Sequence, residues 1–483
     1  GSLTSPQWAV VSKNAEGPNN KKRDNIMNKL LPLSAAIMMA LAPTVNAAEE
    51  LQAQIDELKS QIREMKIDNA GQNLKFGVDY RVTMDSIEYK MADGSKAKND
   101  DLLTNRLWIN MGYKYDDNIS FIGQLSYNKV FGDSFADVGY ADFDWIVNEN
   151  PTDNTLKVRQ AYFLYLGDEF VGIDDVPWSF SMGRRPSNDG FLVNRREGFD
   201  AAQSPLGHSI NVEFDGLSLN TKLDKVTGID GAAVKLCAGR GLTNTTTRFT
   251  MTGTDYAVDD SATDDIDFLG FIFTPFNNGQ YDVKAMVYNA QNLIGYDAQE
   301  AMMGNFQFHD FGDLNNATVS FEVNGIGELI NDFLDNTRVF ASYSVSQTDP
   351  ANDMAMLGST DKETGYSYWL GVNFPGFMDD DSFGVEYNHG SKYWRSFTYG
   401  EDTVIGSKLA ARGDAFEVYY NLPIIDDVWF AQVRYTHIEY DYTGSNGFFG
   451  SASAPMTMAQ AQANMMNPVK EANDLRLLLR YKF

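Results

Sequence analysis

The last ten residues of the chain, Asp474 to Phe483, read DLRLLLRYKF. An apolar side chain stands at every second position, at Leu475, Leu477, Leu479, Tyr481 and Phe483. Charged side chains stand between them, at Arg476, Arg480 and Lys482. A period of two is typical of a β-strand whose two faces meet different surroundings. Because chain ends that lie in water are usually polar and frayed, this ending predicts a strand that is ordered to its last residue.

The same alternation recurs along the chain, for example in LKFGVDYRVTMD (74–85) and NRLWINMGYKY (105–115). Alternating runs of about ten residues are the sequence signature of strands in a transmembrane β-barrel. The mean hydropathy of −0.34 agrees with such strands, since only one face of each is apolar. A secreted β-sandwich also alternates, but its domains have about 100 residues, and this pattern continues from 71 to 483. We therefore predict an all-β fold, a transmembrane antiparallel β-barrel.

Sixteen strands are predicted, near residues 74–88, 103–115, 119–131, 156–166, 177–186, 209–223, 230–240, 265–275, 280–290, 316–326, 336–347, 364–374, 382–390, 411–421, 428–442 and 472–483. Short connections with turn residues, such as 116–118 and 277–279, alternate with long ones, such as 89–102, 132–155 and 187–208. Outer-membrane barrels have this pattern of short periplasmic turns and long external loops. The hairpin signal at Asp215-Gly216 would give an odd count, so we predict one strand that is bulged near Gly216. Fourteen or eighteen strands are the alternatives.

An even number of strands places both barrel termini on the side of the short turns. The last strand must then pair with the first, because hydrocarbon offers no hydrogen-bond partner to an open sheet edge. The terminal Phe483 also resembles the C-terminal signal that bacterial outer-membrane proteins present to the barrel insertion machinery. Outer-membrane lipid and lipopolysaccharide are the expected surroundings, and a Gram-negative outer membrane is the expected location.

Three segments are predicted to precede the barrel. Residues 1–26 contain no Met and are interpreted as a non-native or upstream extension. Residues 27–47 combine a Lys, a short apolar run and small residues before a cleavage point, which predicts a signal peptide. Residues 48–70 carry a heptad seam, which predicts a short periplasmic coiled coil and hence a homo-oligomer, a trimer or dimer. The alternative for 48–70 is a single amphipathic helix at the barrel mouth.

The composition excludes several classes of protein. One Cys permits no disulfide within the chain and no c-type haem, and no cofactor is expected. A net charge of −27 without a basic run argues against nucleic acid as a partner. No G-x-S-x-G motif is present, and the four His are scattered without metal-ligand spacing. His389 near Ser391 is interpreted as an ordinary polar loop entry, so we expect no enzyme.

A barrel of this size surrounds an aqueous channel, and the registers place more basic than acidic residues on its inner face. The acids expected there are Asp79, Asp85, Glu386, Glu417 and Asp474. Rings of Arg and Lys favour anions in a pore, which is one interpretation of this bias. The other is that each inward Arg balances a nearby carboxylate. The acidic external loops are either a solvated surface or a weak site for cations that bridge lipopolysaccharide.

The loop at 187–208 is basic and follows a Pro, and Gly190 allows it to reverse direction. Folded inward it would narrow the channel, and folded outward it would be one basic loop among acidic ones; we favour the inward direction. The residues predicted to line the pore or its constriction are Arg106, Arg159, Arg184, Arg185, Arg195, Arg196, Arg338, Arg434, Arg476 and Arg480.

Three segments carry a family resemblance: MGRRPSNDG (182–190), EYNHGSKYW (386–394) and RGDAFEVYY (412–420). They resemble recurring segments of an uncharacterised, domain-of-unknown-function family of bacterial outer-membrane β-barrels, porin-like and with an N-terminal coiled coil. The resemblance implies the fold and the location, and it implies no substrate.

The function expected from these observations is passive diffusion of small hydrophilic solutes through a channel, with a preference for anions. One alternative is a substrate-specific uptake channel for hydrophobic or carbohydrate ligands, based on Trp108, Trp369, Trp394 and Trp429. These rings could instead form the aromatic girdles at the membrane surfaces. The other alternative is a structural or adhesive protein that is tethered through its coiled coil.

Overall fold

The computed structural model describes residues 74–132, 156–198, 202–245, 253, 255–256, 263–296, 300, 303–305, 307–327, 330–352, 354–378, 380–398, 403–425, 428–445 and 453–483. The predicted extension (1–26), signal peptide (27–47) and coiled coil (48–70) lie outside the described residues.

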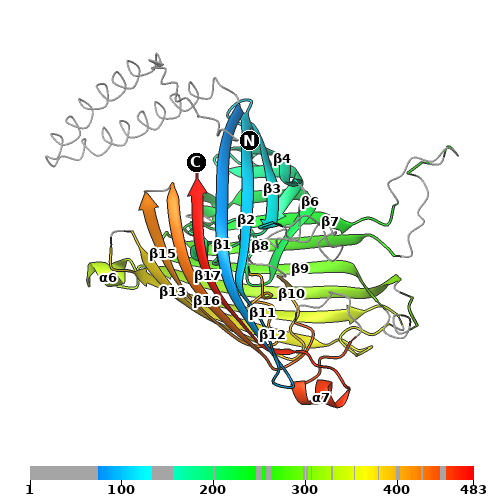
Figure 1. Ribbon diagram of the computed structural model, residues 1–483. Helices are drawn as coiled ribbons and strands as arrows, with labels where there is room; N and C mark the ends of the chain where they lie inside the picture. Colours follow the sequence, from blue (N-terminus) through cyan, green and yellow to red (C-terminus); the bar gives the residue numbers. More distant parts are fainter. Residues whose placement is uncertain are drawn as a thin grey trace, which may run out of the picture. The chain divides into compact units, whose positions relative to one another are not determined.

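Within the described residues, sixteen antiparallel strands form one closed barrel (Figure 1). They are β1 (Leu74–Met91), β2 (Lys96–Lys114), β3 (Ile119–Val130), β4 (Lys157–Gly167), β5 (Trp178–Ser187), β6 (Ile210–Lys222), β7 (Ala233–Leu242), β8 (Ile266–Asn277), β9 (Tyr281–Tyr296), β10 (Phe308–Asn324), β11 (Arg338–Pro350), β12 (Thr364–Pro375), β13 (Ser382–Gly390), β15 (Gly413–Ile425), β16 (Trp429–Tyr440) and β17 (Val469–Lys482). A further two-residue strand, β14 (Phe397–Thr398), pairs in parallel with the start of β6 inside the barrel. The fold and the strand count predicted from the alternation are confirmed.

The barrel closes where its last strand meets its first. β17 pairs with β16 on one side and with β1 on the other, and in Figure 1 the red β17 lies beside the blue β1. The backbone N–H of Phe483 donates to the carbonyl oxygen of Val78 at 2.8 Å, and the N–H of Val78 donates back at 2.9 Å. The last residue is therefore held by two hydrogen bonds, as its apolar side chain predicted.

The alternation of β17 separates two environments. Leu477 is 47% exposed and lies in register with the equally exposed Met84 and Val433 on the neighbouring strands, whereas Arg476 is only 2% exposed. Apolar side chains thus form a continuous band on the outer surface, and charged ones point inward. A band of this kind faces hydrocarbon in a membrane barrel, since the strands hydrogen-bond only to one another.

The connections depart from expectation at the first loop. A long connection was predicted over 89–102, but β1 and β2 continue as a hairpin that turns at residues 92–95. Glu88 in β1 forms ion pairs with Lys96 and Lys98 in β2. Opposite charges on facing strands stabilise their pairing. β9 and β10 likewise extend into the connection that was predicted over 291–315, where residues 297–299, 301–302 and 306 are not described.

The stretch around Gly216 is one strand, as predicted, but it contains no bulge. Gly216 pairs in unbroken register with Gly183 on β5 and with Gly239 on β7. A β-carbon on Gly216 would lie 2.2 Å from the carbonyl oxygen of Ala238. Because these glycines allow the backbones to approach closely, the sheet passes through this region without an additional residue.

The described helices are short. They are α3 (Val193–Arg196), α4 (Asp224–Thr227), α6 (Asp332–Asp335) and α7 (Met458–Ala463). Among the described residues no helix has the length and apolarity needed to cross a membrane. α3 matters most for the site, because it belongs to the loop between β5 and β6.

Candidate functional site: the barrel interior

Residues 188–198 and 202–209, which we call the inner loop, lie between β5 and β6 and fold into the barrel. Arg195 on α3 contacts Glu322 of β10 at 2.5 Å. Arg196 contacts Glu417 of β15 at 3.2 Å, and its carbonyl oxygen accepts a hydrogen bond from Gln432 of β16 at 2.8 Å. These strands are distant from β5 and β6 in the sheet order, so the inner loop crosses the interior. This is the inward direction that the sequence favoured.

A second segment, residues 391–398 and 403–412, also folds inward, and the sequence did not predict it. Its β14 pairs with β6, and the ring of Trp394 is buried with its Nε1 donating to the carbonyl oxygen of Leu409 at 2.8 Å. Lys408 contacts Glu386 of β13 at 2.6 Å and also pairs with Glu417. The signal for this arrangement was available in SKLAAR (407–412), which is basic and apolar although the loops as a group are acidic.

Charged side chains gather on one side of the interior, over β13, β15–β17 and β1–β4, which we call the ionic half. Its centre is Glu197 of the inner loop, whose carboxylate lies 2.7 Å from Arg196, 3.4 Å from Arg434 and 4.0 Å from Arg81. Further buried pairs surround it: Arg480 with Asp79 (2.8 Å) and Arg476 with Asp85 (2.5 Å). At the edge of this half, Arg159 of β4 pairs with Glu213 of β6 (3.2 Å). Buried charges that are paired and hydrogen-bonded hold segments in a fixed arrangement.

The numbers of buried charges are nearly equal. Ten basic side chains are buried among the described residues: Arg81, Arg106, Arg159, Arg196, Arg395, Lys408, Arg412, Arg434, Arg476 and Arg480. Nine carboxylates are buried there: Asp79, Asp85, Glu197, Glu213, Glu322, Asp381, Glu386, Glu417 and Asp474. Four of these acids, Glu197, Glu213, Glu322 and Asp381, were absent from the predicted inner face. The balance favours the second interpretation of the inward arginines, in which each one pairs with a nearby carboxylate.

The other arginines in the predicted set occupy different surroundings. Arg106 and Arg159 lie over the ring of Trp108, with guanidinium carbons 3.5 and 4.0 Å from its centre. Arg185 lies over Tyr162 at 4.4 Å, whereas its neighbour Arg184 binds Glu213 at 3.0 Å and the carbonyl oxygen of Val158 at 3.1 Å.

Arg338 is the first residue of β11, and its Nε donates to Asn324 at 2.6 Å. It therefore lies at the end of the barrel where the short turns are. The lining role of the predicted set stays a prediction.

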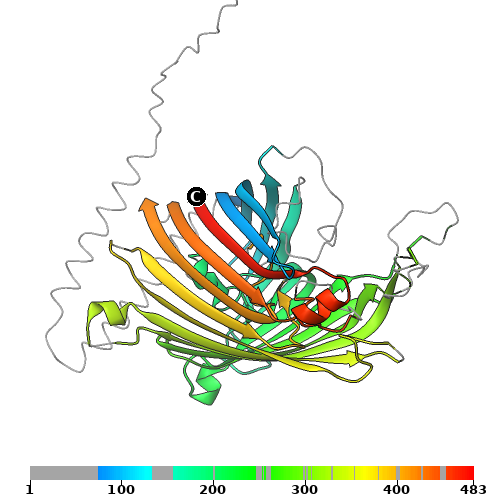
Figure 2. The ribbon, with the colours of Figure 1, turned by 60° about the horizontal axis from the view of Figure 1, so that its bottom comes forward.

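The opposite side of the interior, over β6–β10, is packed with apolar side chains, and we call it the apolar half. Its buried cluster includes Phe268, Met286 and Tyr288 of the wall, together with Leu206 of the inner loop and Phe397 of the second segment. Phe214 stacks on Phe268, with ring centres 5.0 Å apart. In Figure 2 the green strands carry this half, and the blue, orange and red strands carry the ionic half.

The tryptophans offer little surface to a solute. Trp108, Trp369 and Trp394 point inward and are buried by protein, whereas Trp429 is exposed on the outer surface beside Tyr481. Of these four rings, only Trp429 has the position expected for an aromatic girdle. An aromatic platform for carbohydrates or hydrophobic ligands is therefore not supported by these residues.

His208 of the inner loop is buried and joins it to the wall. Its Nδ1 lies 2.8 Å from Ser342 and its Nε2 lies 2.9 Å from Ser367. Burial lowers the pKa of His208 to about 3, so the ring is neutral at ordinary pH. Because the His208 imidazole has no exposure to solvent, it serves as a structural link between loop and wall.

His389 and Ser391, which lie close together in the sequence, have separate hydrogen-bond partners. His389 contacts Asp414 at 2.9 Å, and the hydroxyl oxygen of Ser391 accepts a hydrogen bond from the N–H of Tyr366. No group of His, Cys, Asp or Glu suited to a metal ion occurs in the described part of the chain.

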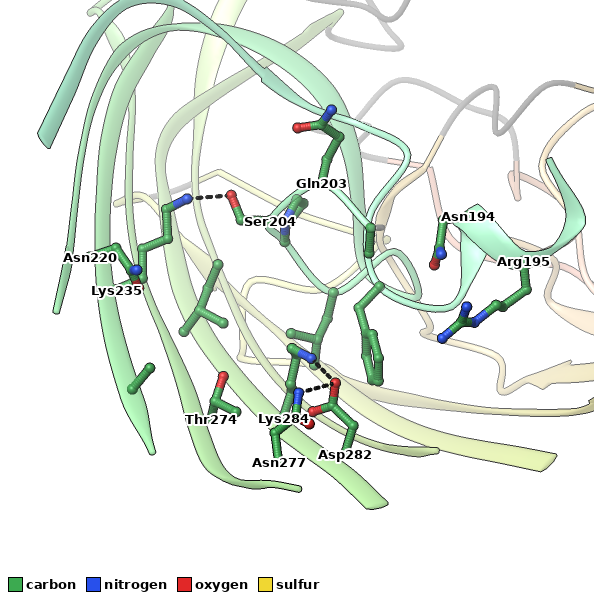
Figure 3. Close-up of a pocket in the computed structure, with 16 residues that line it drawn as sticks. Asn194, Arg195, Gln203, Ser204, Asn220, Lys235, Thr274, Asn277, Asp282 and Lys284 are labelled. Atoms are coloured by element: carbon green, nitrogen blue, oxygen red, sulfur yellow. Dashed lines mark hydrogen bonds and ion pairs between the residues drawn. The ribbon is translucent and has the colours of Figure 1, made fainter. Parts of the chain in front are cut away.

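A cavity of about 420 Å³ lies beneath the inner loop, at the barrel end that carries the short turn 278–280 (Figure 3). Its wall comes from β6–β9, and its roof comes from Phe191, Asn194, Arg195 and residues 202–206 of the inner loop. Lys235 of β7 and Ser204 of the loop point toward one another across it, at 2.5 Å. Lys284 and Asp282 of β9 form an ion pair on the other side.

Comparison with solved structures returns outer-membrane proteins of low identity. Salmonella typhi OmpF in complex with daunomycin is 12% identical, with 85% of this chain and 98% of that chain covered and a TM-score of 0.43. Pseudomonas putida OprB is 12% identical, with 87% and 96% covered and a TM-score of 0.47. An anion-selective porin from Comamonas acidovorans is 10% identical, with 85% and 100% covered and a TM-score of 0.47. Our assignment of the fold rests on the strand pairing described above.

The sequence comparisons give one family. No curated protein matches the chain. A family model described as "Protein of unknown function (DUF3373)" matches residues 96–483, which include every barrel strand except β1. The chain belongs to this family of proteins of unknown function, and the described residues of this member form a closed β-barrel of sixteen antiparallel strands.

Proposed function

We propose that this protein is a channel for the passive diffusion of small hydrophilic solutes across the outer membrane of a Gram-negative bacterium. The observation that carries the proposal is the contrast between the two faces of one closed sheet. The outer face is apolar, and much of the inner face is charged or hydroxyl-bearing around a cavity. Barrels of this size enclose aqueous pathways.

The inner loop supplies the selectivity expected of such a channel. It is attached to distant strands by Arg195, Arg196 and Glu197 and therefore narrows the interior. A pathway that passes between an ordered loop and the wall discriminates by solute size and by the charges that remain available.

A preference for anions is the finer part of the proposal. Most inward arginines are paired with carboxylates, so they contribute little net field. Lys235 differs, because its ammonium group donates to the hydroxyl of Ser204 and no carboxylate of the described residues lies within ion-pair distance of it. A cation of this kind in a channel wall attracts anions.

The expected partners follow from the surface of the barrel. Lipid and lipopolysaccharide would contact the outer apolar band, and the insertion machinery would read the C-terminal strand that ends at Phe483. A homo-oligomer, trimeric or dimeric through the 48–70 coiled coil, completes the proposal.

Recording in planar lipid bilayers tests the function. Purified protein is expected to give discrete conductance steps in KCl, and the reversal potential across a KCl gradient is expected to have the sign of chloride preference. Membrane insertion without any conductance would contradict the channel and favour the structural or tethering alternative. A reversal potential with the sign of potassium preference would leave the channel intact and remove the anion preference.

A further inference from the structure

The cavity beneath the inner loop has a polar wall with one cation in excess. Three basic side chains line it: Arg195, Lys235 and Lys284. Arg195 is paired with Glu322 and Lys284 with Asp282, which leaves the charge of Lys235 without a carboxylate among the described residues. The excess charge of the cavity is therefore concentrated at one ammonium group.

The surroundings of Lys235 strengthen this local field. A second, smaller cavity adjoins the first at Ser204, and Arg185 lines it. Arg185 lies over the ring of Tyr162 and donates to Ser218 at 3.4 Å, so its partners there are neutral. Two basic groups thus act on the region of Ser204, where an anion would be stabilised at short range.

Half of the twelve uncharged lining residues carry hydrogen-bonding groups. Amide or hydroxyl side chains line the cavity at Asn194, Gln203, Ser204, Asn220, Thr274 and Asn277. Asp282 adds an acceptor: its Oδ2 binds Lys284 and Asn277, whereas its buried Oδ1 has no hydrogen-bond donor among the described residues. A buried carboxylate oxygen without a donor gains free energy when a ligand hydroxyl binds to it.

Apolar side chains line the cavity as well: Phe191, Ala202, Pro205, Leu206, Ala233 and Ile272. The Lys284 ammonium lies 3.9 Å from the centre of the Phe191 ring, so a cation covers one face of that ring. A volume of about 420 Å³ lies within the ordinary range of small-molecule sites.

We propose that this cavity binds a small polyhydroxylated monoanion, with its carboxylate at Lys235 and its hydroxyl groups on the amide, hydroxyl and Asp282 side chains of the wall. The proposal rests on the proposed channel function and specifies a solute class for it. Both the ammonium group and the hydrogen-bonding side chains are needed for recognition, since one ammonium group alone would not distinguish this solute from chloride.

The test compares gluconate, which has both the carboxylate and the hydroxyl groups, with ligands that lack one of these features or carry an additional charge. Gluconate carries the carboxylate and the hydroxyl groups, glucose lacks the charge, propionate lacks the hydroxyl groups, and glucose 6-phosphate carries a second negative charge. Binding to the full mature protein in detergent is measured by calorimetry, and block of the KCl current is measured in bilayers. Gluconate is expected to bind about tenfold or more tightly than the other three.

Variants connect the preference to the cavity. Lys235→Met is expected to lose the advantage of gluconate over glucose, and Lys235→Arg is expected to retain most of it. Lys222→Met is the matched control, because Lys222 is exposed at the end of β6 and does not line the cavity. Heat-dependent migration on a gel shows whether each barrel has folded, and the wild-type ligand series stands even if Lys235→Met does not fold.

The outcomes separate this inference from the proposed function. Equal binding of gluconate, glucose and propionate would overturn the inference, while conductance steps in the same protein would preserve the channel. Tighter binding of glucose 6-phosphate would overturn the monoanion assignment. Selective gluconate binding without any conductance would contradict the proposed channel but would support the binding site.

Discussion

The ionic and apolar halves of the interior belong to the same barrel and contact the same two inward segments. In the ionic half, Arg196 of the inner loop and Lys408 of the second segment bind Glu417 on the wall. In the apolar half, Leu206 and Phe397 of the same segments pack on the wall cluster. The alternation of each strand decides which residues point inward. Whether those inward residues are charged or apolar agrees with the residues of the inner loop or second segment that they contact.

Substitutions in the two halves should destabilise the barrel by different amounts, and the largest loss of stability is expected at Glu417. Its carboxylate binds Arg196 and Lys408 and accepts a hydrogen bond from Thr436 at 2.7 Å. Glu417→Gln keeps the shape of the side chain but leaves two buried cations without their shared counter-charge. We expect the free energy of unfolding to fall by about 3–5 kcal/mol, measured by urea titration of the protein in lipid vesicles.

The matched control for this change is Glu439→Gln on the neighbouring strand. Glu439 is exposed, and its contact with Lys470 is at 4.0 Å. An exposed pair of this kind contributes less than about 1 kcal/mol. If Glu417→Gln cost no more than Glu439→Gln, the ionic half would not be what holds the two segments in place.

A second change extends the comparison to the outer surface, which is apolar over both halves. Arg476 and Leu477 are adjacent, yet the first faces Asp85 and the second faces outward. Leu477→Arg is expected to lower the free energy of unfolding in vesicles by about 2–4 kcal/mol, because it places a cation in hydrocarbon. Leu477→Met is the control, and a similar small cost for both variants would mean that this band does not lie in the membrane.

The sequence was sufficient to predict the strands of the barrel wall, but it was not sufficient to predict which wall residues bind the two inward segments. Period-two alternation is local, so the strands, the closure at Phe483 and the inward direction of Arg476 followed from neighbouring residues. One partner of Arg196 is Glu417, 221 positions away, and no local pattern connects them. The sequence predicted both side chains inside the barrel and could not predict that they pair.

The apolar half left a signal that alternation alone did not explain. In DFLGFIFTPF (267–276) both faces of the strand carry large apolar residues. Phe268 and Ile272 point inward into the cluster, whereas Leu269, Phe271 and Phe273 are exposed outside. A strand that is apolar on both faces predicts a packed partner inside the barrel. Identifying that partner required the folded positions of the two inward segments.

A third change tests the apolar half with a substitution as conservative as Glu417→Gln. Met286→Leu nearly preserves volume within the cluster and is expected to cost less than about 1.5 kcal/mol. Met286→Ala should cost about 2–5 kcal/mol, since it leaves a cavity. Urea titration compares the three variants directly. A cost for Met286→Leu equal to that of Glu417→Gln would show that both halves depend equally on exact side-chain identity.

The smallest effect concerns His208, which joins the inner loop to the wall through Ser342 and Ser367. Burial lowers the pKa of the docked ring to about 3, whereas an undocked ring titrates near 6.5. Between these values the undocked form binds a proton that the docked form does not, so docking weakens as the pH falls below about 6.5. At pH 5.5 the docking equilibrium should be weaker by about tenfold than at pH 7.5.

Hydrogen exchange of the backbone at residues 202–209, corrected for intrinsic rates, measures this equilibrium in the folded barrel. His208→Gln removes the titration while retaining a polar side chain, so its exchange should change little between pH 7.5 and pH 5.5. The same acid response in both proteins would assign the effect to other groups near the loop.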